Sequence, residues 1–283
     1  MKDTRKATMA IIKRKPRNAS LRFQSFVTTS DITTTVPYSG LVSGLKKRSG
    51  GRNAYGRITT RHRGGGADRK YRIIDFNNSQ RNISGKVITV EYDPNRNARI
   101  MLVSYANGAK SYLLKPDKVS VGDTIIASET ADAKAGNSMP LKNVPDGYMV
   151  HNVEIRPGSK GTFVRSAGTY AQIIGKANNH VTLKMPSGEV RMVLDSCWAT
   201  IGQLSNVDYK NISWGKAGRI RHLGFRPSVR GMAMNPVDHP HGGGEGRSKS
   251  GSHPRTPWGK GCKGTRTRKV RNVNSLIIKR RKV

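Results

Sequence analysis

Cysteine, acidic side chains and long apolar runs are all scarce in this sequence. Its two cysteines, Cys197 and Cys262, form no Cys-x-x-Cys pair, so a disulfide framework or zinc site is not expected and a reducing compartment is the default. The apolar run at residues 100–103 has the length of a strand, whereas a membrane span needs about 18 apolar residues. No apolar signal peptide precedes Met9, which resembles an alternative start before AIIKRKP. We therefore expect no membrane partner.

The shortage of acidic residues leaves the chain strongly basic. It has 17 Asp and Glu residues against 52 Lys and Arg residues, a formal net charge of +35. The excess lies at the two ends: residues 1–70 have 17 basic and 3 acidic residues, residues 201–283 have 19 and 3, and residues 71–200 have 16 and 11. Solubility requires far less charge than this, so the composition favours a protein that binds nucleic acid.

Large aliphatic side chains are sparse between residues 215 and 264, where glycine, proline, arginine, lysine and histidine dominate. Such a segment has too little apolar surface to offset the entropy cost of ordering the chain, so it stays disordered or folds on a partner. Each Lys or Arg set against a phosphate releases counterions, and glycine lets the backbone approach a crowded polyanion. Nucleic acid is the expected partner of this segment too.

The near-neutral middle of the chain shows the pattern of short strands. Turn signals separate five stretches rich in β-branched and aromatic residues: 71–77, 84–93, 98–106, 109–115 and 124–128. Five short strands in this space are typical of a small barrel, and the oligonucleotide-binding fold (OB-fold) suits the expected partner. We predict an RNA-binding OB-fold domain at residues 71–128.

A polar stretch at residues 129–147 is the expected boundary to a second block of strands. Its predicted strands are residues 148–156, 162–168, 170–176, 180–185 and 189–194. This pattern indicates an SH3-like barrel domain at residues 129–200, and one short basic helix is expected within residues 214–223. The predicted fold class is all-β: an OB-fold and then an SH3-like barrel, between long basic, mostly irregular extensions at residues 1–70 and 201–283.

The string VDHPHGGGEG brings Asp238, His239, His241 and Glu245 close together in sequence. A metal site and a general base are the reactive alternatives. The flanking prolines and the triple glycine leave no regular element to hold ligands, so packing against RNA is the favoured interpretation. Neither a G-x-S-x-G nucleophile motif nor a G-x-x-x-x-G-K-[ST] phosphate loop occurs, and no enzyme is expected.

The stretch SGGRNAYGRITTRHRGGGADRKYR, residues 49–72, combines arginines, glycines and aromatic rings. Guanidinium groups bind phosphates bidentately, and glycines allow close backbone approach. Tyr55 and His62 are placed to stack on unpaired bases. A solvated basic tail is the alternative, but such a tail needs neither the spaced glycines nor the aromatic rings.

Several strings resemble a single family: GRITTRHRGGG, YRIIDF, EYDPNR, VHNVEI, RSAGTYAQI, GKAGRIR and RGMAMNPVDHPHGGGEGR. From about residue 46 to the end, the chain is similar to ribosomal large-subunit protein two in its bacterial or organellar form. The first 45 residues resemble the family loosely, and Ala67 stands where the family has histidine. The resemblance implies an OB-fold followed by an SH3-like barrel, with extensions that enter the large-subunit rRNA.

The resemblance implies a structural constituent of the large ribosomal subunit that binds rRNA near the peptidyl transferase region. It implies roles in subunit assembly and association, tRNA placement and translation. Further implied partners are neighbouring ribosomal proteins, tRNA in the vicinity and the small subunit at an intersubunit bridge. Peptidyl transfer is then RNA-centred, so the protein has at most a supporting role and needs no cofactor beyond structural Mg ions held mainly by the rRNA. The expected location is the ribosome of the cytoplasm, with an organellar ribosome as the alternative.

Carried over residue by residue, the resemblance implies no catalytic or metal-binding residue but two sets of RNA-facing residues. The set near the peptidyl transferase region is Asp238, His239, His241, Gly242, Gly243 and Gly244. The rRNA-binding set is Arg52, Arg57, Arg61, His62, Arg63, Arg69, Lys70, Lys216, Arg219, Arg221, Arg230, Arg247, Lys279, Arg280, Arg281 and Lys282.

Two other classes of protein remain as alternatives to a ribosomal protein. A free-standing RNA chaperone or translational regulator would share the charge and the barrels, but it would not need extensions that lack a core. A transferase would need a preformed pocket of perturbed groups, which the sequence does not indicate.

Overall fold

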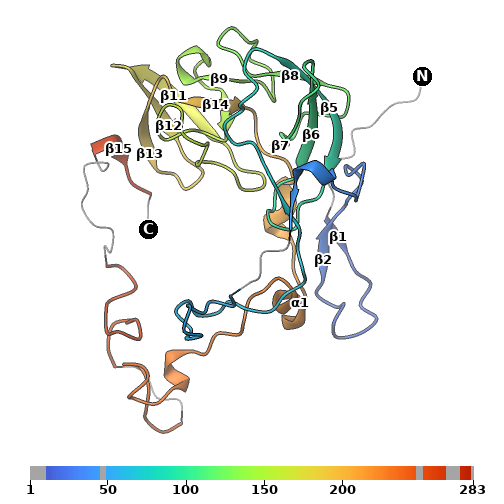
Figure 1. Cartoon of the computed structure of the whole chain (residues 1–283). Coiled ribbons are helices and arrows are strands. Elements are labelled where there is room, and N and C mark those ends of the chain that lie inside the picture. The colour runs from blue at the N-terminus through green and yellow to red at the C-terminus, as the bar shows by residue number, and fades with distance from the viewer. Residues whose placement is uncertain (1–10, 45–48, 247–250, 266–274, 282–283) are drawn as a thin grey trace. The chain divides into compact units, whose positions relative to one another are not determined.

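The computed structural model describes four stretches of the chain: residues 11–44, 49–246, 251–265 and 275–281. Contacts between Cα atoms group the chain into two compact units. Unit 1 consists of residues 1–47, 68–219 and 275–282, and unit 2 consists of residues 48–67, 220–274 and 283. Every strand of the described stretches belongs to unit 1 (Figure 1). The domain boundaries expected from the sequence stay a prediction.

Unit 1 contains a four-stranded antiparallel sheet in the order β7-β6-β5-β8. Its strands are β5 (Ser84–Glu91), β6 (Ile100–Tyr105), β7 (Lys110–Leu114) and β8 (Thr124–Ile126). Alternate residues of β6 point to opposite faces, so Met101 and Val103 join one apolar cluster while Ile100 and Leu102 join another. Four of the five strands predicted for the first barrel are therefore present.

The fifth predicted strand, residues 71–77, is much shorter than predicted. β4 (Tyr71–Arg72) pairs with β3 (Val42–Ser43), which follows the 3-10 helix η1 (Ser39–Leu41). Beyond β4 the chain changes partner, because Asp75 N–H donates to Tyr112 O at 2.9 Å, and the Asp75 carboxylate then accepts the N–H groups of Asn77 and Ser79 at 2.9 and 2.8 Å. The four-stranded sheet is therefore open rather than a closed barrel.

A second sheet has seven antiparallel strands in the order β15-β13-β12-β11-β10-β14-β9 (Figure 1). Its strands are β9 (Ser138–Pro140), β10 (Met149–His151), β11 (Ala171–Ala177), β12 (His180–Lys184), β13 (Val190–Leu194), β14 (Trp198–Ile201) and β15 (Ile277–Lys279). Alternating residues such as Ile173, Val181, Leu183 and Val193 bury one continuous core. The all-β prediction is confirmed, with two open sheets.

Several details of the second sheet differ from the prediction: β14 was not predicted, and β10 is much shorter than the strand predicted at residues 148–156. β9 lies in the predicted polar stretch, where Met139 and the 3-10 helix η2 (Leu141–Asn143) contribute to the core. β15, close to the C-terminus, pairs with β13 at the sheet edge. Residues 162–168 form no strand, because Val164 has a φ of 56°, in the left-handed region that interrupts an extended chain.

Backbone hydrogen bonds join the two sheets within unit 1. Ser128 N–H donates to Ser138 O at 3.0 Å, and Ser205 N–H donates to Lys115 O at 3.1 Å. These bonds connect the first strand block to the second at two separate places. The two sheets therefore support each other within one unit.

The remaining elements are short. They are the hairpin of β1 (Ile11–Lys13) and β2 (Ser25–Val27), the 3-10 helices η3 (Val207–Asn211) and η4 (Gly231–Ala233), and the helix α1 (Ala217–His222). α1 is the short basic helix that the sequence predicted. None of the helices in the described stretches is long and apolar enough to cross a membrane.

Candidate nucleic-acid interface

Unit 2 is built from two tracts that lie far apart in the sequence. Gly64 N–H donates to Gly224 O at 3.0 Å, and Arg226 N–H donates to His62 O at 3.1 Å. Both bonds join backbone to backbone, so they place residues 49–67 beside the segment that follows α1 (Figure 1). The two glycine-rich basic tracts that the sequence analysis treated separately form one structure.

Residues 51–60 form a tight loop that exposes basic and aromatic side chains. Thr60 N–H donates to Gly51 O at 3.0 Å, and Gly51 has a φ of 79°, where a side chain would also overlap Thr60 O. The Asn53 side-chain oxygen accepts hydrogen bonds from the N–H groups of Tyr55 and Arg57, at 3.0 Å each. This turn leaves the Tyr55 side chain 89% exposed.

His239 is the one buried residue among the described residues of unit 2, with 8% exposure. Its Nδ1 accepts a hydrogen bond from the His241 backbone N–H at 3.0 Å, and the two imidazole rings lie 4.8 Å apart. Gly231 packs against the same ring so closely that any Cβ there would overlap Nδ1. A ring nitrogen that accepts a hydrogen bond uses its lone pair for it, so the lone pair of Nδ1 is used within its own loop.

The triple glycine closes this histidine loop. Gly242 N–H donates to His239 O at 2.9 Å, and a side chain at Gly242 would overlap the backbone of Asn235. Gly243 has a φ of 86°, and a Cβ there would lie 2.6 Å from Pro236 Cγ. The loop conformation itself therefore requires glycine at these two positions, independently of RNA.

His241 connects the histidine loop to a hairpin at residues 254–262. Its Nε2 accepts a hydrogen bond from the Arg255 backbone N–H at 3.0 Å. In the hairpin, Thr256 N–H donates to Lys260 O at 2.8 Å and Cys262 N–H donates to Pro254 O at 3.0 Å. The two histidines thus hold neighbouring backbone segments together.

The predicted rRNA-binding residues fall into three groups by position. Arg247 and Lys282 lie outside the described residues. In unit 2, the side chain of Arg221 is half-buried, and the others are exposed: Arg52, Arg57, Arg61, His62, Arg63 and Arg230. In unit 1, Arg69 and Arg219 are half-buried, and the exposed ones are Lys70, Lys216, Lys279, Arg280 and Arg281.

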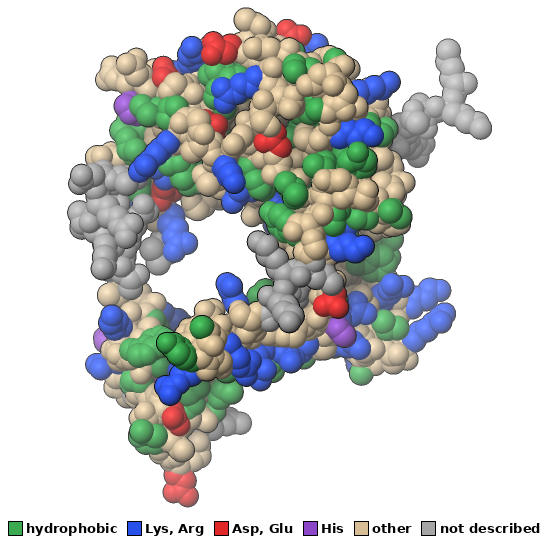
Figure 2. Space-filling model, viewed as in Figure 1, with side chains coloured by type: hydrophobic (Ala, Val, Ile, Leu, Met, Phe, Trp, Pro, Cys, Tyr) green, Lys and Arg blue, Asp and Glu red, His purple; other side chains and the backbone are tan. Residues whose placement is uncertain are grey.

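The positive charge of unit 2 is not neutralised by its own carboxylates. Its described stretches have ten Lys and Arg residues and two acidic residues, Asp238 and Glu245. Within those stretches no guanidinium or ammonium group pairs with a carboxylate, and the ion pairs found among the described residues lie in unit 1. On the face shown in Figure 2, basic and hydrophobic side chains lie next to one another over the part that Figure 1 colours orange.

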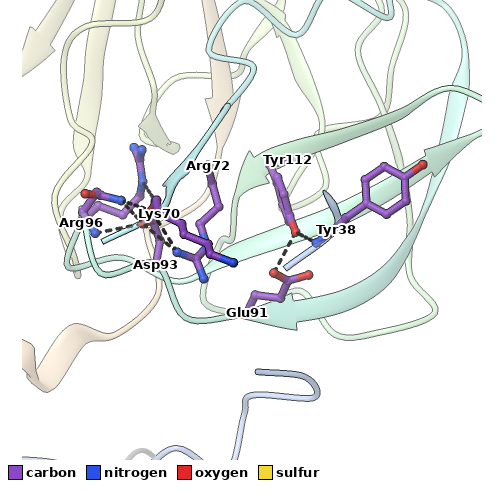
Figure 3. A network of polar contacts seen from close by, with 8 residues as sticks. Tyr38, Lys70, Arg72, Glu91, Asp93, Arg96 and Tyr112 are labelled. Carbon is purple, nitrogen blue, oxygen red and sulfur yellow. Dashed lines mark hydrogen bonds and ion pairs between the residues drawn. The ribbon is translucent and has the colours of Figure 1, made fainter. Parts of the chain in front are cut away.

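A polar network in unit 1 fixes the backbone at Lys70 (Figure 3). The Asn95 side-chain N–H donates to Lys70 O at 2.8 Å, and the Arg72 guanidinium donates to the same oxygen at 3.3 Å. Asp93, which is fully buried, lies between the guanidinium groups of Arg72 and Arg96. The side chain of Lys70 is therefore presented from a rigid backbone.

The same region of unit 1 contains a buried tyrosine. The Tyr112 hydroxyl donates to Glu91 Oε2 at 2.8 Å and accepts the Tyr38 backbone N–H at 2.7 Å (Figure 3). Burial raises the pKa of Tyr112 to about 12. These bonds tie the segment before β3 to the four-stranded sheet.

The metal alternative for the histidine cluster finds no support in the geometry. Within the described part of the chain, no three His, Cys, Asp or Glu side chains converge as metal ligands. In this cluster His239 Nδ1 accepts the His241 backbone N–H, and His241 Nε2 accepts the Arg255 backbone N–H. Their lone pairs are therefore used within the protein.

Two family models match most of the chain. The model described as Ribosomal Proteins L2, RNA binding N-terminal domain, matches residues 38–127. The model described as Ribosomal Proteins L2, C-terminal domain, matches residues 134–259. The chain belongs to the ribosomal protein L2 family. This L2-family protein is an RNA-binding structural component of the large ribosomal subunit, and its two domains fit the predicted order of an OB-fold and an SH3-like barrel.

One basic feature of this L2-family protein was missed by the sequence analysis. In unit 1 a groove of about 670 Å³ is lined by Phe76, Arg96 and Arg165, and the two guanidinium groups lie 5.5 and 4.5 Å from the centre of the Phe76 ring. The left-handed Val164 immediately precedes Arg165, and strained backbone of this kind is often found at functional sites. Both arginines stand in strings that carried the family resemblance, EYDPNR and RSAGTYAQI, but neither stands in a glycine-rich tract.

Proposed function

We propose that this L2-family protein binds large-subunit rRNA through unit 2, next to the peptidyl transferase region, and thereby supports subunit assembly, subunit association and tRNA placement. The observation that carries the proposal is the excess of unpaired basic groups on a unit without an apolar core. Such a unit gains both its charge neutralisation and much of its order from a polyanion. Arg165 in the groove of unit 1, whose guanidinium lies over the Phe76 ring, provides a second phosphate-binding group.

The role of His239 in this proposal is to hold the loop in shape, not to move protons. A general base must accept a proton from the reacting group, but Nδ1 already accepts the His241 N–H and the ring is 8% exposed. Peptidyl transfer is then centred on RNA, with no metal or cofactor in the protein beyond Mg ions held mainly by the rRNA. The further proposed partners are neighbouring ribosomal proteins and the small subunit, in ribosomes of the cytoplasm or of an organelle.

Sedimentation tests the ribosomal part of this proposal. A tagged copy of the chain should co-sediment with large subunits from cell extracts, including at moderate salt that strips weakly bound chaperones. A chain that stays in the light fractions would instead favour a free-standing RNA chaperone or regulator.

The positional role of His239 is tested by two isosteric substitutions. In His239→Asn the side-chain oxygen can replace Nδ1 as acceptor, while His239→Gln keeps hydrogen-bonding capacity farther from the backbone. Assembled subunits with either substitution should form peptide bonds nearly as fast as the unchanged ones. Fully assembled subunits slowed by roughly 100-fold or more would indicate general-base chemistry instead.

A further inference from the structure

Unit 2 contains a pocket of about 470 Å³ with apolar walls and a basic rim. Ile58, Val229, Met234 and Trp258 supply apolar surface. The surrounding guanidinium groups belong to Arg52, Arg61, Arg63 and Arg226. His239 also lines the pocket, so the buried histidine forms part of its wall.

Trp258 is held at this pocket by the hairpin at residues 254–262. Gly259 N–H donates to Thr256 O at 2.9 Å, and Gly259 has a φ of 77°, so the turn presents Trp258 at its tip. The hydrogen bond between Arg255 N–H and His241 Nε2 fixes the base of the hairpin. The indole is nevertheless 74% exposed, a large apolar surface for a residue in a fixed turn.

The charges around Trp258 indicate what kind of ligand would cover it. The Arg61 guanidinium lies 5.5 Å from the centre of the indole ring, and the pocket has no carboxylate among its lining residues. A ligand that suits this site has a flat apolar face for the indole and negative charge for the arginines. A nucleotide whose base projects from its strand has both.

The pocket is large enough for such a group. Its volume lies within the range of about 300–1,000 Å³ that is usual for small-ligand sites. A paired base in a duplex has both faces covered by its neighbours, and extracting it costs stacking and pairing energy, whereas an unpaired base is already available. The occupant should therefore come from a single-stranded loop or bulge.

We propose that this pocket, the Trp258 pocket, binds one unpaired base of the large-subunit rRNA. The base stacks on the indole of Trp258, and the flanking phosphates lie against Arg61 and the neighbouring guanidinium groups. The hydrogen bonds of His239 and His241 keep the hairpin and its tryptophan in position for this contact. This inference rests on the proposed function and adds to it a defined site and a defined state of the RNA.

Fluorescence of the full-length chain tests the proposal. Trp214→Phe leaves Trp258 as the exposed tryptophan, because Trp198 is buried. The probes are a single-stranded oligoadenylate of about 12 nucleotides, an abasic strand of equal length and an RNA duplex of equal length. We expect the oligoadenylate to quench Trp258, and the duplex and the abasic strand to bind through charge without quenching it.

Substitutions at the pocket then separate stacking from charge. Trp258→Ala should weaken binding of the oligoadenylate roughly tenfold and leave duplex binding unchanged within about twofold. Trp258→Phe, which keeps an aromatic face, should retain most of the affinity, whereas Trp258→Leu should not. Phe23→Ala is the matched control, because Phe23 is 66% exposed, lies under the Arg22 guanidinium and does not line the pocket.

The possible outcomes separate a failure of the Trp258-pocket proposal from a failure of the proposed function. Binding of all three probes with equal affinity and no quenching would overturn the Trp258 pocket and leave rRNA binding intact. Equal weakening of duplex and single-strand binding in Trp258→Ala would also overturn it, since the indole would then act only on folding. Absence of any RNA binding, together with failure to co-sediment with large subunits, would overturn both.

Discussion

Units 1 and 2 belong to one chain, but different interactions stabilise each of them. Unit 1 buries strand residues such as Val150, Ile173, Val181 and Leu183, and the carboxylate of its buried Asp93 pairs with guanidinium groups. In the described part of unit 2 the one buried residue is His239, and the loops are held by backbone hydrogen bonds and close-packed glycines. Unit 1 is therefore stabilised mainly by a buried apolar core, and unit 2 mainly by backbone hydrogen bonds.

This difference determines what each unit needs from its surroundings. Burial of an aliphatic side chain contributes about 1.5–3 kcal/mol, whereas a hydrogen bond exchanged with water contributes about 0.5–1.5 kcal/mol net. Ordering a residue costs about 1–2 kcal/mol of backbone entropy, and glycine loses more than other residues. We therefore expect unit 1 to be stable alone and unit 2 to gain much of its stability from RNA.

The largest expected difference is in the loss of unfolding free energy caused by an isoleucine-to-alanine substitution in each unit. Ile173→Ala, at a position with 1% exposure, should lower the free energy of unfolding by about 2–5 kcal/mol. Ile58→Ala, at 55% exposure, should change it by less than about 0.5 kcal/mol. Urea unfolding followed by circular dichroism measures both. A comparable loss for Ile58→Ala would show that unit 2 has a core of its own.

The next effect is a pH dependence that belongs to unit 1. His151 is buried with its Nδ1 bonded to Gly202 O at 2.8 Å, and burial lowers its pKa to about 4 from the ordinary 6.5. The unfolded chain then binds the extra proton between pH 6.5 and 4, so the stability due to the neutral ring is complete above pH 6.5 and is lost as the pH falls toward 4. Between pH 7 and pH 5 this loss should be about 2 kcal/mol.

His151→Asn provides the control, since the asparagine amide can donate the same hydrogen bond but does not titrate. Unfolding free energies of both proteins at pH 7 and pH 5 give the comparison. An equal decline in the two proteins would assign the acid sensitivity to other groups.

The smallest predicted effect concerns Gly231, which packs against the His239 ring. Gly231→Ala places a methyl group against the His239 ring, so the loop must shift. RNA affinity should fall roughly tenfold, or about 1.4 kcal/mol, while the unfolding midpoint of unit 1 stays unchanged. Gly218→Ala is the control, because a Cβ there would lie 3.9 Å from Lys216 Cε, an ordinary van der Waals contact. If both substitutions weaken RNA binding equally, the contact between Gly231 and His239 does not determine RNA affinity.

Local patterns predicted most of unit 1, and side-chain details account for the failures. Alternating residues correctly indicated β5 to β8 and β11 to β13. The strand predicted at residues 71–77 is short because the chain changes partner at Asp75, whose N–H donates to Tyr112 O, and residues 162–168 form no strand because Val164 adopts a left-handed conformation. β9 and β15 exist through pairing with distant strands, which no local period can reveal.

For the candidate site, charge identified the tracts but not their arrangement. The bonds between Gly64 and Gly224 and between His62 and Arg226 join backbone atoms, so they leave no pattern in the side chains. Arg96 and Arg165 were missed because each stands alone in an ordinary strand block, and a common ring, Phe76, brings them together. The buried state of His239 depends on Gly231, eight residues earlier, and could not be deduced from its own string.

The pairing of β15 with β13 makes the segment between α1 and β15 a loop fixed at both ends, since residues 217–219 and 275–281 both belong to unit 1. A free tail can enter a finished opening in folded RNA end first. A closed loop cannot do so without releasing one end. If rRNA surrounds this segment in the large subunit, either the RNA helices close around it after it has docked, or β15 detaches first. In that case β15, an edge strand of three residues within the basic C-terminal extension, constrains the order of events during assembly.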